Sequence, residues 1–296
     1  MIKYRKYFYI FSTTLVVASV LAVAVFGLSF GIDFNGGSLL EVEFKDSFPK
    51  LNDLREKLVP LNLGEIVIQN VGDGGAMLRF AEVDEPTHQN VLNALKEFSD
   101  LEELRFESVG PVIGEETKQK SSWAILFVSV MILVYVAWAF KKVSYPVSSW
   151  QYGVVALIAL IHDIIITVGV MAFVGHFTKM EVGVPFVAAL LTILGYSVND
   201  TIVIFDRIRE NLIKGAISLD FEAIINRSLK ETYFRSFTTG ISTLFVLFAI
   251  LFFGEASTQH FVLTLIIGII VGTYSSIFFA SPLLFSWAML KRKSKR

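Results

Sequence analysis

The stretch Gly195-Tyr-Ser-Val-Asn-Asp-Thr-Ile-Val-Ile-Phe-Asp-Arg-Ile-Arg-Glu-Asn211 places Asn199 and Asp200 inside an apolar run that begins near Val184. The run ends at a cluster of charged residues, namely Asp206, Arg207, Arg209 and Glu210. A carboxylate at membrane depth is costly, by about 3 kcal/mol on insertion scales. Such a group usually pairs with a cation or carries ions, and both roles point to transport rather than to soluble chemistry.

The composition agrees with a membrane protein. Hydrophobic residues make up 54% of the 296 residues and charged residues only 18%, which is far from the average of soluble domains. The chain contains no cysteine, so disulfides, metal-thiolate sites and thiol chemistry are excluded. The sequence also shows no nucleotide-binding loop, metal-ligand cluster or nucleophile constellation, and nucleic acid is not an expected partner.

Six apolar segments are long enough to cross a bilayer, which requires about 20 residues. The predicted spans are Phe8–Phe30, Trp123–Phe140, Val147–Val174, Val184–Phe205, Ser236–Gly254 and Phe261–Met289. The first span contains Ala22-Val-Ala24, which resembles the cleavage site of a secretory signal. It is too long for the apolar region of a typical signal, so we expect an uncleaved transmembrane helix.

Basic residues mark one side of the predicted membrane. If six helices alternate, the N-terminal tail, Lys141 with Lys142, the loop from Arg207 to Lys230 and the tail from Lys291 to Arg296 all lie on the same face. The positive-inside rule therefore predicts that both termini are cytoplasmic. The expected division is residues 1–30 (tail and first helix), 31–122 (extracytoplasmic domain), 123–290 (the other five helices) and 291–296 (basic tail).

The one large outer connection, residues 31–122, predicts a folded α+β domain. Alternating apolar residues predict strands over Leu39–Phe44, Glu65–Val71, Ala76–Ala81 and Glu103–Val109, with the middle two joined by a turn over Gly72–Gly75. Helical spacing predicts helices over Pro49–Leu61 and Pro86–Phe98, whose expected inward residues are Leu51, Leu54, Leu58, Val91, Leu92, Leu95 and Phe98. The order β-α-β-β-α-β is that of the ferredoxin-like split βαβ unit.

Two sets of small residues have a predicted mechanical role. Gly268, Gly272 and Ser276 recur every four residues in the sixth span, so a neighbouring helix can approach closely, either within the chain or in another subunit. Gly36 and Gly37 follow Asp33 at the outer end of the first span. These three residues form either a hinge or proton entrance that couples the outer domain to the membrane, or a turn cap at the membrane edge.

The candidate ion pathway begins with Asp200, which lies about 10 Å inside the charged end of its helix at a rise of 1.5 Å per residue. A carboxylate held between an apolar interior and a cation can load and release a proton, although a static polar contact with help from Asn199 is the alternative. Arg235, at the start of the fifth span, can reach a similar depth, but a basic residue there also snorkels.

Asp163 lies near the middle of the third span and is as enclosed by apolar residues as Asp200. We expect it to belong to the polar core, either as an ion carrier or as a packing contact. His162 is its chain neighbour, and we expect its side chain to point to another face because residues i and i+1 do not face each other on a helix.

Three motifs together resemble the SecF branch of the bacterial SecD/SecF protein-export family, which belongs to the resistance-nodulation-division superfamily. They are Phe30-Gly-Ile-Asp-Phe-Asn-Gly-Gly37 after the first span, Gly195–Asn211 at the end of the fourth, and Gly272–Ser276 with Ala280-Ser-Pro282 in the sixth. The resemblance covers the whole chain. It implies a fold with six transmembrane helices, half of a transporter of that superfamily, and one ferredoxin-like extracytoplasmic domain.

The resemblance also implies a function. The chain would work with SecD beside the SecYEG translocon in the bacterial cytoplasmic (inner) membrane and drive late steps of the export of unfolded preproteins, using the proton or sodium gradient. It would be a transport subunit in contact with membrane lipid, without enzymatic activity or a cofactor. In this family an acidic residue of the fourth helix and an arginine near the fifth are linked to proton passage, which implies these roles for Asp200 and Arg235.

Three other functions compete with this one. Asp163 and Asp200 could form the dyad of an intramembrane aspartyl protease, but such enzymes carry a Gly-x-Gly-Asp pattern, whereas this chain has Ser197-Val-Asn-Asp200. An efflux pump of the same superfamily usually has twelve helices and two large outer domains. A passive assembly subunit, whose polar residues only hold SecD in place, is the main alternative.

Overall fold

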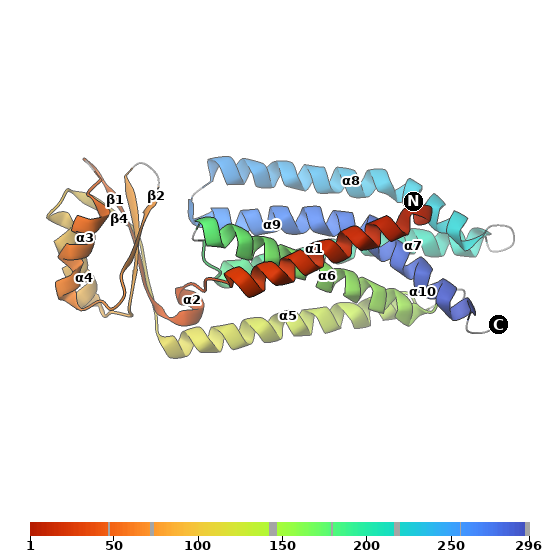
Figure 1. Cartoon of the computed structure of the whole chain (residues 1–296), viewed down its shortest axis with the longest axis horizontal. Helices are drawn as coiled ribbons and strands as arrows, with labels where there is room; N and C mark the ends of the chain where they lie inside the picture. Colours follow the sequence, from red (N-terminus) through yellow and green to blue (C-terminus); the bar gives the residue numbers. More distant parts are fainter. Residues whose placement is uncertain are drawn as a thin grey trace. The chain divides into compact units, whose positions relative to one another are not determined.

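The computed structural model describes residues 1–46, 48–71, 74–141, 147–178, 180–215, 220–254 and 256–293. The chain divides into two compact units (Figure 1). One comprises Met1–Ser29 and Trp123–Arg296, here called the helix bundle, and the other comprises Phe30–Ser122, here called the small domain.

The small domain is built on one four-stranded sheet with the strand order β2-β3-β1-β4. The strands are β1 (Gly37–Phe44), β2 (Val67–Val71), β3 (Gly75–Phe80) and β4 (Leu101–Val109), and each neighbouring pair is antiparallel. The helices α3 (Leu51–Leu58) and α4 (Glu85–Lys96) lie on one face of this sheet (Figure 1). The predicted ferredoxin-like order is confirmed.

The core of the small domain forms between that sheet face and the two helices. Leu40 pairs with Leu78 across the sheet, and both are fully buried together with Leu54 and Leu95 of the helices. The prediction that Leu51 and Phe98 belong to this core is wrong. Leu51 is 41% exposed because it opens α3 on the outer side of the first turn, and Phe98 is 38% exposed because it lies beyond the end of α4. Of the predicted turn, Gly72 and Asp73 lie outside the described residues.

In the part of the chain that is described, six helical stretches are long and apolar enough to cross a membrane. The helices involved are α1 (Arg5–Phe26), α5 (Pro111–Ala139), α6 (Ser149–Thr178), α7 (Val184–Gly215), α8 (Phe221–Phe253), and α9 (Ala256–Ser275) continued by a π-helical segment (Ser276–Ala280) and α10 (Ser281–Lys293). The protein is therefore an α-helical polytopic membrane protein with one ferredoxin-like domain.

Several helix ends differ from the predicted spans. The first helix ends at Phe26, because Gly27 adopts φ +69°. At their charged ends α7 continues to Gly215 and α8 starts at Phe221, well beyond the predicted Phe205 and Ser236. Hydropathy marks the apolar stretch of a helix, whereas these extra turns are amphipathic: they bury apolar residues such as Leu212 and Leu229, and polar contacts join the two helices.

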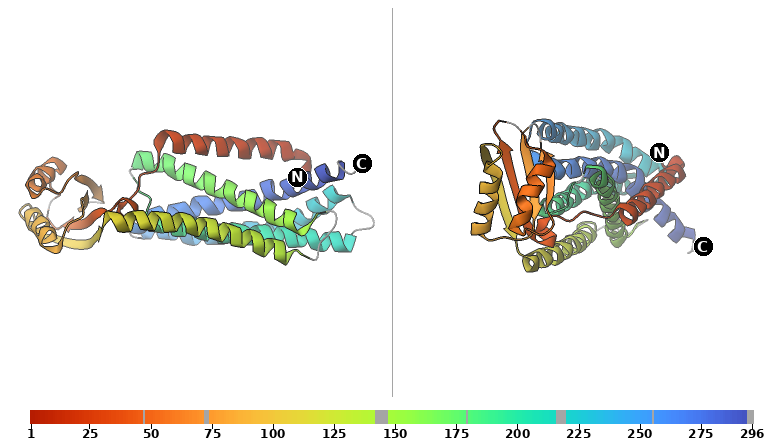
Figure 2. Two further views of the ribbon diagram at one scale, coloured as in Figure 1. Left: turned by 90° about the horizontal axis from the view of Figure 1, so that it is seen from below. Right: turned by 60° about the vertical axis from the view of Figure 1, so that its left-hand side comes forward.

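Helices α6 and α9 occupy the centre of the bundle. In their most apolar windows 56% of residues are buried, against 11% in α1, 6% in α5 and 17% in α8. Glycines set two close approaches: Gly169 of α6 packs directly on Ser19 of α1, and Gly268 of α9 packs directly on Ile193 of α7. Figure 2 shows the bundle from two further directions. The outer faces of α1, α5 and α8 are left for lipid or another chain to cover.

The start of α1, the start of α8 and α10 lie at one end of the bundle. The backbone N–H of Ile2 donates to Asn226 Oδ1 at 3.1 Å, and Phe221 stacks on Phe285 with ring centroids 5.7 Å apart. The guanidinium of Arg5 lies 5.1 Å from the centroid of the Phe285 ring. Basic residues from distant parts of the sequence therefore share this end. Lys142, Lys295 and Arg296, which supported the predicted topology, lie outside the described residues.

Candidate site of two buried carboxyl groups

Asp163 joins three helices at the centre of the bundle. Its carboxyl group is only 1% exposed. Oδ2 accepts hydrogen bonds from the hydroxyl groups of Ser197 on α7, at 2.6 Å, and Ser275 on α9, at 2.8 Å. Oδ1 lies 2.9 Å from His162 Nδ1 on the same helix. Both oxygens are thus paired, as buried polar groups usually are.

The predicted orientation of His162 is wrong. Its ring reaches back to the carboxyl group of the next residue and is stacked on Phe279, with centroids 4.5 Å apart and an interplanar angle of 15°. The helical rule concerns the directions of the Cβ atoms, and two long side chains on adjacent residues can still meet beyond them. His162 and Asp163 therefore form one polar unit at the centre of the bundle.

Hydroxyl groups surround this unit, and Ser197 and Ser281 among them were not predicted from the sequence. Thr201 and Ser276 are hydrogen-bonded at 2.8 Å, Ser276 also donates to the Ser197 carbonyl at 3.4 Å, and Ser281 donates to the Ser276 carbonyl at 3.0 Å. A signal was present: Ser197 and Thr201 are four residues apart, so they share one face of α7. Two buried serines then follow Gly272 on the facing helix.

Gly272 is what permits this close packing. A Cβ atom there would lie 3.0 Å from the Ser197 Cβ and 3.6 Å from Asp163 Oδ2. The three predicted small residues Gly268, Gly272 and Ser276 therefore all lie against α7 within this chain.

Asp200 has a different environment, between α7 and α8. Its Oδ1 accepts a hydrogen bond from the hydroxyl of Ser236. Its Oδ2 is buried and has no hydrogen-bond partner among the described residues. Arg235 precedes Ser236 in the chain but is not within ion-pair distance of Asp200 in the described part of the chain. Asn199 is exposed on α7 and does not join this contact.

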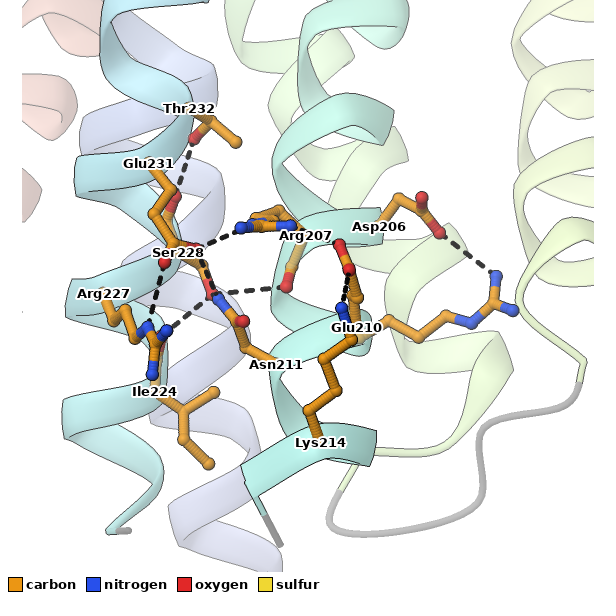
Figure 3. A network of polar contacts seen from close by, with 11 residues as sticks. Asp206, Arg207, Glu210, Asn211, Lys214, Ile224, Arg227, Ser228, Glu231 and Thr232 are labelled. Carbon is orange, nitrogen blue, oxygen red and sulfur yellow. Dashed lines mark hydrogen bonds and ion pairs between the residues drawn. The ribbon is translucent and has the colours of Figure 1, made fainter.

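Arg235 instead lines a cavity of about 410 Å³ at the charged end of α5, α7 and α8. The charged residues in its wall are Asp206, Arg207, Arg209, Glu210, Glu231 and Arg235, three of each sign. A network beside the cavity ties α7 to α8: Glu231 accepts from Arg207 at 2.7 Å and from Asn211 at 2.8 Å (Figure 3). This network stabilises the extra turns of both helices.

The predicted hinge lies within the small domain. Asp33 belongs to the short helix α2 (Ile32–Asn35), and Gly36 and Gly37 follow with φ +74° and +119°. A Cβ at Gly36 would lie 2.8 Å from Pro111 Cα, and one at Gly37 would lie 2.8 Å from the Phe80 carbonyl oxygen. Both glycines are therefore required by backbone conformation and by close backbone packing.

Asp163 and Asp200 share no hydrogen-bond partner among the described residues. A protease dyad needs two carboxyl groups in direct contact, so this geometry gives no support to that function. The fold and the site together define a class: a polytopic membrane protein with ionisable groups held between its helices, as in ion-coupled transporters.

Comparison with known families agrees with this class. The family described as "Protein export membrane protein SecD/SecF, C-terminal" matches residues 89–290, and "SecD/SecF GG Motif" matches residues 21–47. The chain belongs to the SecD/SecF family of protein export membrane proteins. Its architecture is that of one half of a transporter of the resistance-nodulation-division type.

Individual relatives cover nearly the whole chain. It is 40% identical to the protein translocase subunit SecF of Thermobaculum terrenum, over 97% of this chain and 93% of the relative, and 37% identical to that of Desulfurispirillum indicum, over 96% and 90%. It superimposes on the crystal structure of SecDF from Thermus thermophilus with a TM-score of 0.83 and 31% identity. The match covers 97% of this chain but only 38% of that longer chain.

Proposed function

We propose that the chain works with SecD and the SecYEG translocon to drive late steps of the export of unfolded preproteins across the bacterial cytoplasmic membrane. The energy source is the proton or sodium gradient, and the chain is a transport subunit rather than an enzyme, with no cofactor. The similarity to SecF subunits supports the process, and the match to one part of SecDF supports a second, SecD-type half. The sparsely buried helices α1, α5 and α8 offer faces for that half and for lipid.

The observation that carries the gradient-driven role is the half-satisfied carboxyl group of Asp200. A static contact within a membrane helix would use both oxygens, whereas here Oδ2 is buried and unpartnered among the described residues. A proton binding there removes the charge and supplies a donor. Arg235, next to the serine that holds Asp200, faces the cavity and is placed to exchange its interaction with water for one with an ionised Asp200.

The other predicted site residues have roles in addition to the interaction between Asp200 and Arg235. Asp163 is the second carboxyl group of the proposed ion pathway, and Asn199, exposed next to Asp200 on α7, contributes to that pathway. With the basic end of the bundle in the cytoplasm, both termini are cytoplasmic and the small domain is extracytoplasmic. Asp33, Gly36 and Gly37 follow α1 in the chain, and their proposed role is to couple the small domain to the membrane helices.

The available energy suits a conformational bias. One proton moving down about 100 mV releases roughly 2.3 kcal/mol. That shifts a two-state equilibrium by about fifty-fold. Such a bias is sufficient to favour one position of the small domain and to hold or release an emerging unfolded chain, whose extended backbone an exposed strand edge can bind.

Export of a model preprotein in cells that carry Asp200→Asn tests this function, after co-purification shows that the variant still assembles with SecD and SecYEG. We expect slow late-stage export with intact assembly. The matched control is Asp220→Asn, whose exposed carboxylate precedes α8, lies outside the cavity wall and makes no capping hydrogen bond within the described chain; it should export normally. Normal gradient-dependent export by Asp200→Asn would instead leave the chain as an assembly subunit.

A further inference from the structure

The hydroxyl of Ser275 has two acceptors within reach. Its Oγ lies 2.8 Å from Asp163 Oδ2 and 3.1 Å from the carbonyl oxygen of Gly272. A hydroxyl group has one hydrogen to donate and two lone pairs that accept. Ser275 can therefore donate to only one of these oxygens at a time, and whichever it leaves must find another partner.

Both choices give a fully paired site. When Asp163 is ionised, Ser275 and Ser197 both donate to Oδ2. When Oδ2 carries a proton, that proton is donated to Ser275 Oγ, and Ser275 turns its own hydrogen to the Gly272 carbonyl. No heavy atom has to move, and no buried group loses its partner, which would be costly at this depth.

The other neighbours of Asp163 lack this property. The hydroxyl of Ser197 has Asp163 Oδ2 as its only hydrogen-bond partner in the described part of the chain. His162 donates from Nδ1 to Oδ1 in either state, which requires the tautomer with hydrogen on Nδ1. Its Nε2 is buried without a partner among the described residues. His162 is therefore a positioning residue for the carboxyl group.

The site suits a proton rather than a metal ion. Three contacts of 2.6 to 2.9 Å already surround the carboxyl group, and a metal ion would have to separate them. Among the described residues no lysine or arginine forms an ion pair with Asp163. Of the other titratable groups on the packed helices, Asp200 is held by Ser236, Tyr9 by Ser286 and Tyr274 by Ser12, and Tyr152 lies on α6 itself.

We propose that Asp163 is a proton-binding site separate from Asp200, and that Ser275 exchanges its hydrogen-bond partner when the proton binds or leaves. This rests on the gradient-driven role proposed above and assigns a new function to Ser275 and His162. The π-helical segment begins directly after Ser275 and carries Phe279, which stacks on His162. A shift of that segment would therefore change the contacts of both residues that hold the carboxyl group.

Infrared difference spectroscopy tests this on the full chain in lipid nanodiscs, with isotopically labelled aspartate and a stepwise change of pH. We expect a carbonyl band of a protonated carboxyl group that disappears in Asp163→Asn and persists in Asp200→Asn. Ser275→Ala should shift this band, because the protonated carboxyl loses its acceptor. Ser197→Ala should leave its frequency unchanged.

Two results would overturn the proposal. One is a wild-type spectrum without a band that Asp163→Asn removes. The other is a band that shifts in Ser197→Ala but not in Ser275→Ala, which would move the switch to α7. If Ser275→Ala does not fold, Ser275→Cys, with a weaker acceptor, must shift the band, and an unshifted band counts against Ser275. These spectra report on proton binding without export, so they are independent of the Asp200→Asn test of function.

Discussion

Asp163 and Asp200 are the same residue type on neighbouring membrane helices, yet their surroundings differ. Asp163 pairs both oxygens, with contacts from α6, α7 and α9. Asp200 pairs one oxygen with Ser236 and leaves the other buried without a partner among the described residues. Depth in the membrane therefore does not decide what a buried carboxyl group does. The partners do: Asp163 is held from three helices, whereas Asp200 has one partner in the described chain and is the more easily altered group.

Replacing each of the two aspartates with alanine should show the difference between the two sites most clearly. Asp163→Ala leaves the Ser197 hydroxyl and one imidazole N–H unpaired in the core, while Ser275 keeps the Gly272 carbonyl as an acceptor, and we expect a loss of about 3–5 kcal/mol in the free energy of unfolding. Asp200→Ala leaves only the Ser236 hydroxyl unpaired, so the loss should be about 1–3 kcal/mol. Equilibrium unfolding of the purified chain in detergent measures both.

Asp163→Asn is the control for this pair, because the amide keeps the volume of the side chain and most of its hydrogen bonds. It should unfold closer to the wild type than Asp163→Ala does. Equal losses for Asp163→Ala and Asp200→Ala would show that the two sites are equivalent and that the contacts of Asp163 do not stabilise the bundle.

A methyl group added at Gly272 tests how closely α7 and α9 pack beside Asp163. In Gly272→Ala the new Cβ would lie 3.0 Å from the Ser197 Cβ, so α7 and α9 must separate, at a cost of about 1–3 kcal/mol. Gly195→Ala on α7 is the matched control, because nothing lies within 4 Å of its Cβ position. The control should be neutral or gain up to about 1 kcal/mol. A Gly272→Ala chain as stable as the control would mean that this packing is loose.

The sequence predicted the six spans, the order of the strands, and the position of two carboxyl groups inside apolar spans. These features could be predicted because hydropathy and periodicity depend on each segment alone. Helix ends were less predictable. The last turns of α7 carry charged as well as apolar residues, and they are stabilised by Glu231 of α8, a residue in a different segment. Phe98 has an apolar side chain at helical spacing, but α4 ends before it.

The difference between Asp163 and Asp200 could not be predicted in this way. It depends on which hydroxyl groups the other helices bring to each carboxyl group, and Ser275 and Ser197 are far from Asp163 in the sequence. The contact between His162 and Asp163 depends on side-chain torsions beyond Cβ, which a helical projection leaves out. Hydropathy can be read from one segment alone, whereas the hydrogen-bond partners of a side chain depend on the assembled bundle.

Removing the single partner of Asp200 gives a smaller effect. Ser236→Ala deletes one hydrogen bond, and we expect a loss of about 1 kcal/mol in the free energy of unfolding. Ser197→Ala at Asp163 should lose a similar amount, because Ser275 and His162 remain. Unfolding of both variants in detergent checks this, and a much larger loss for Ser236→Ala would show that this single hydrogen bond organises the α7–α8 contact.

The smallest expected effect comes from a solvent-exposed carboxylate in the small domain. Asp84 caps α4 of the small domain, and hydrogen bonds from Thr87 hold its pKa below the ordinary value of 3.8. A lowered pKa means that the folded state favours the ionised form, so the stabilisation is present above pH 3.8 and is lost as the pH falls through the folded value. Hydrogen exchange of the first-turn amides of α4 should therefore accelerate, relative to its intrinsic rate, only in acid. Asp84→Ala should show the faster exchange at neutral pH and no further acid step. An acid step that persists in this variant would assign it to another group, such as Glu85, whose pKa is also lowered by hydrogen bonds from Gln89 and His88.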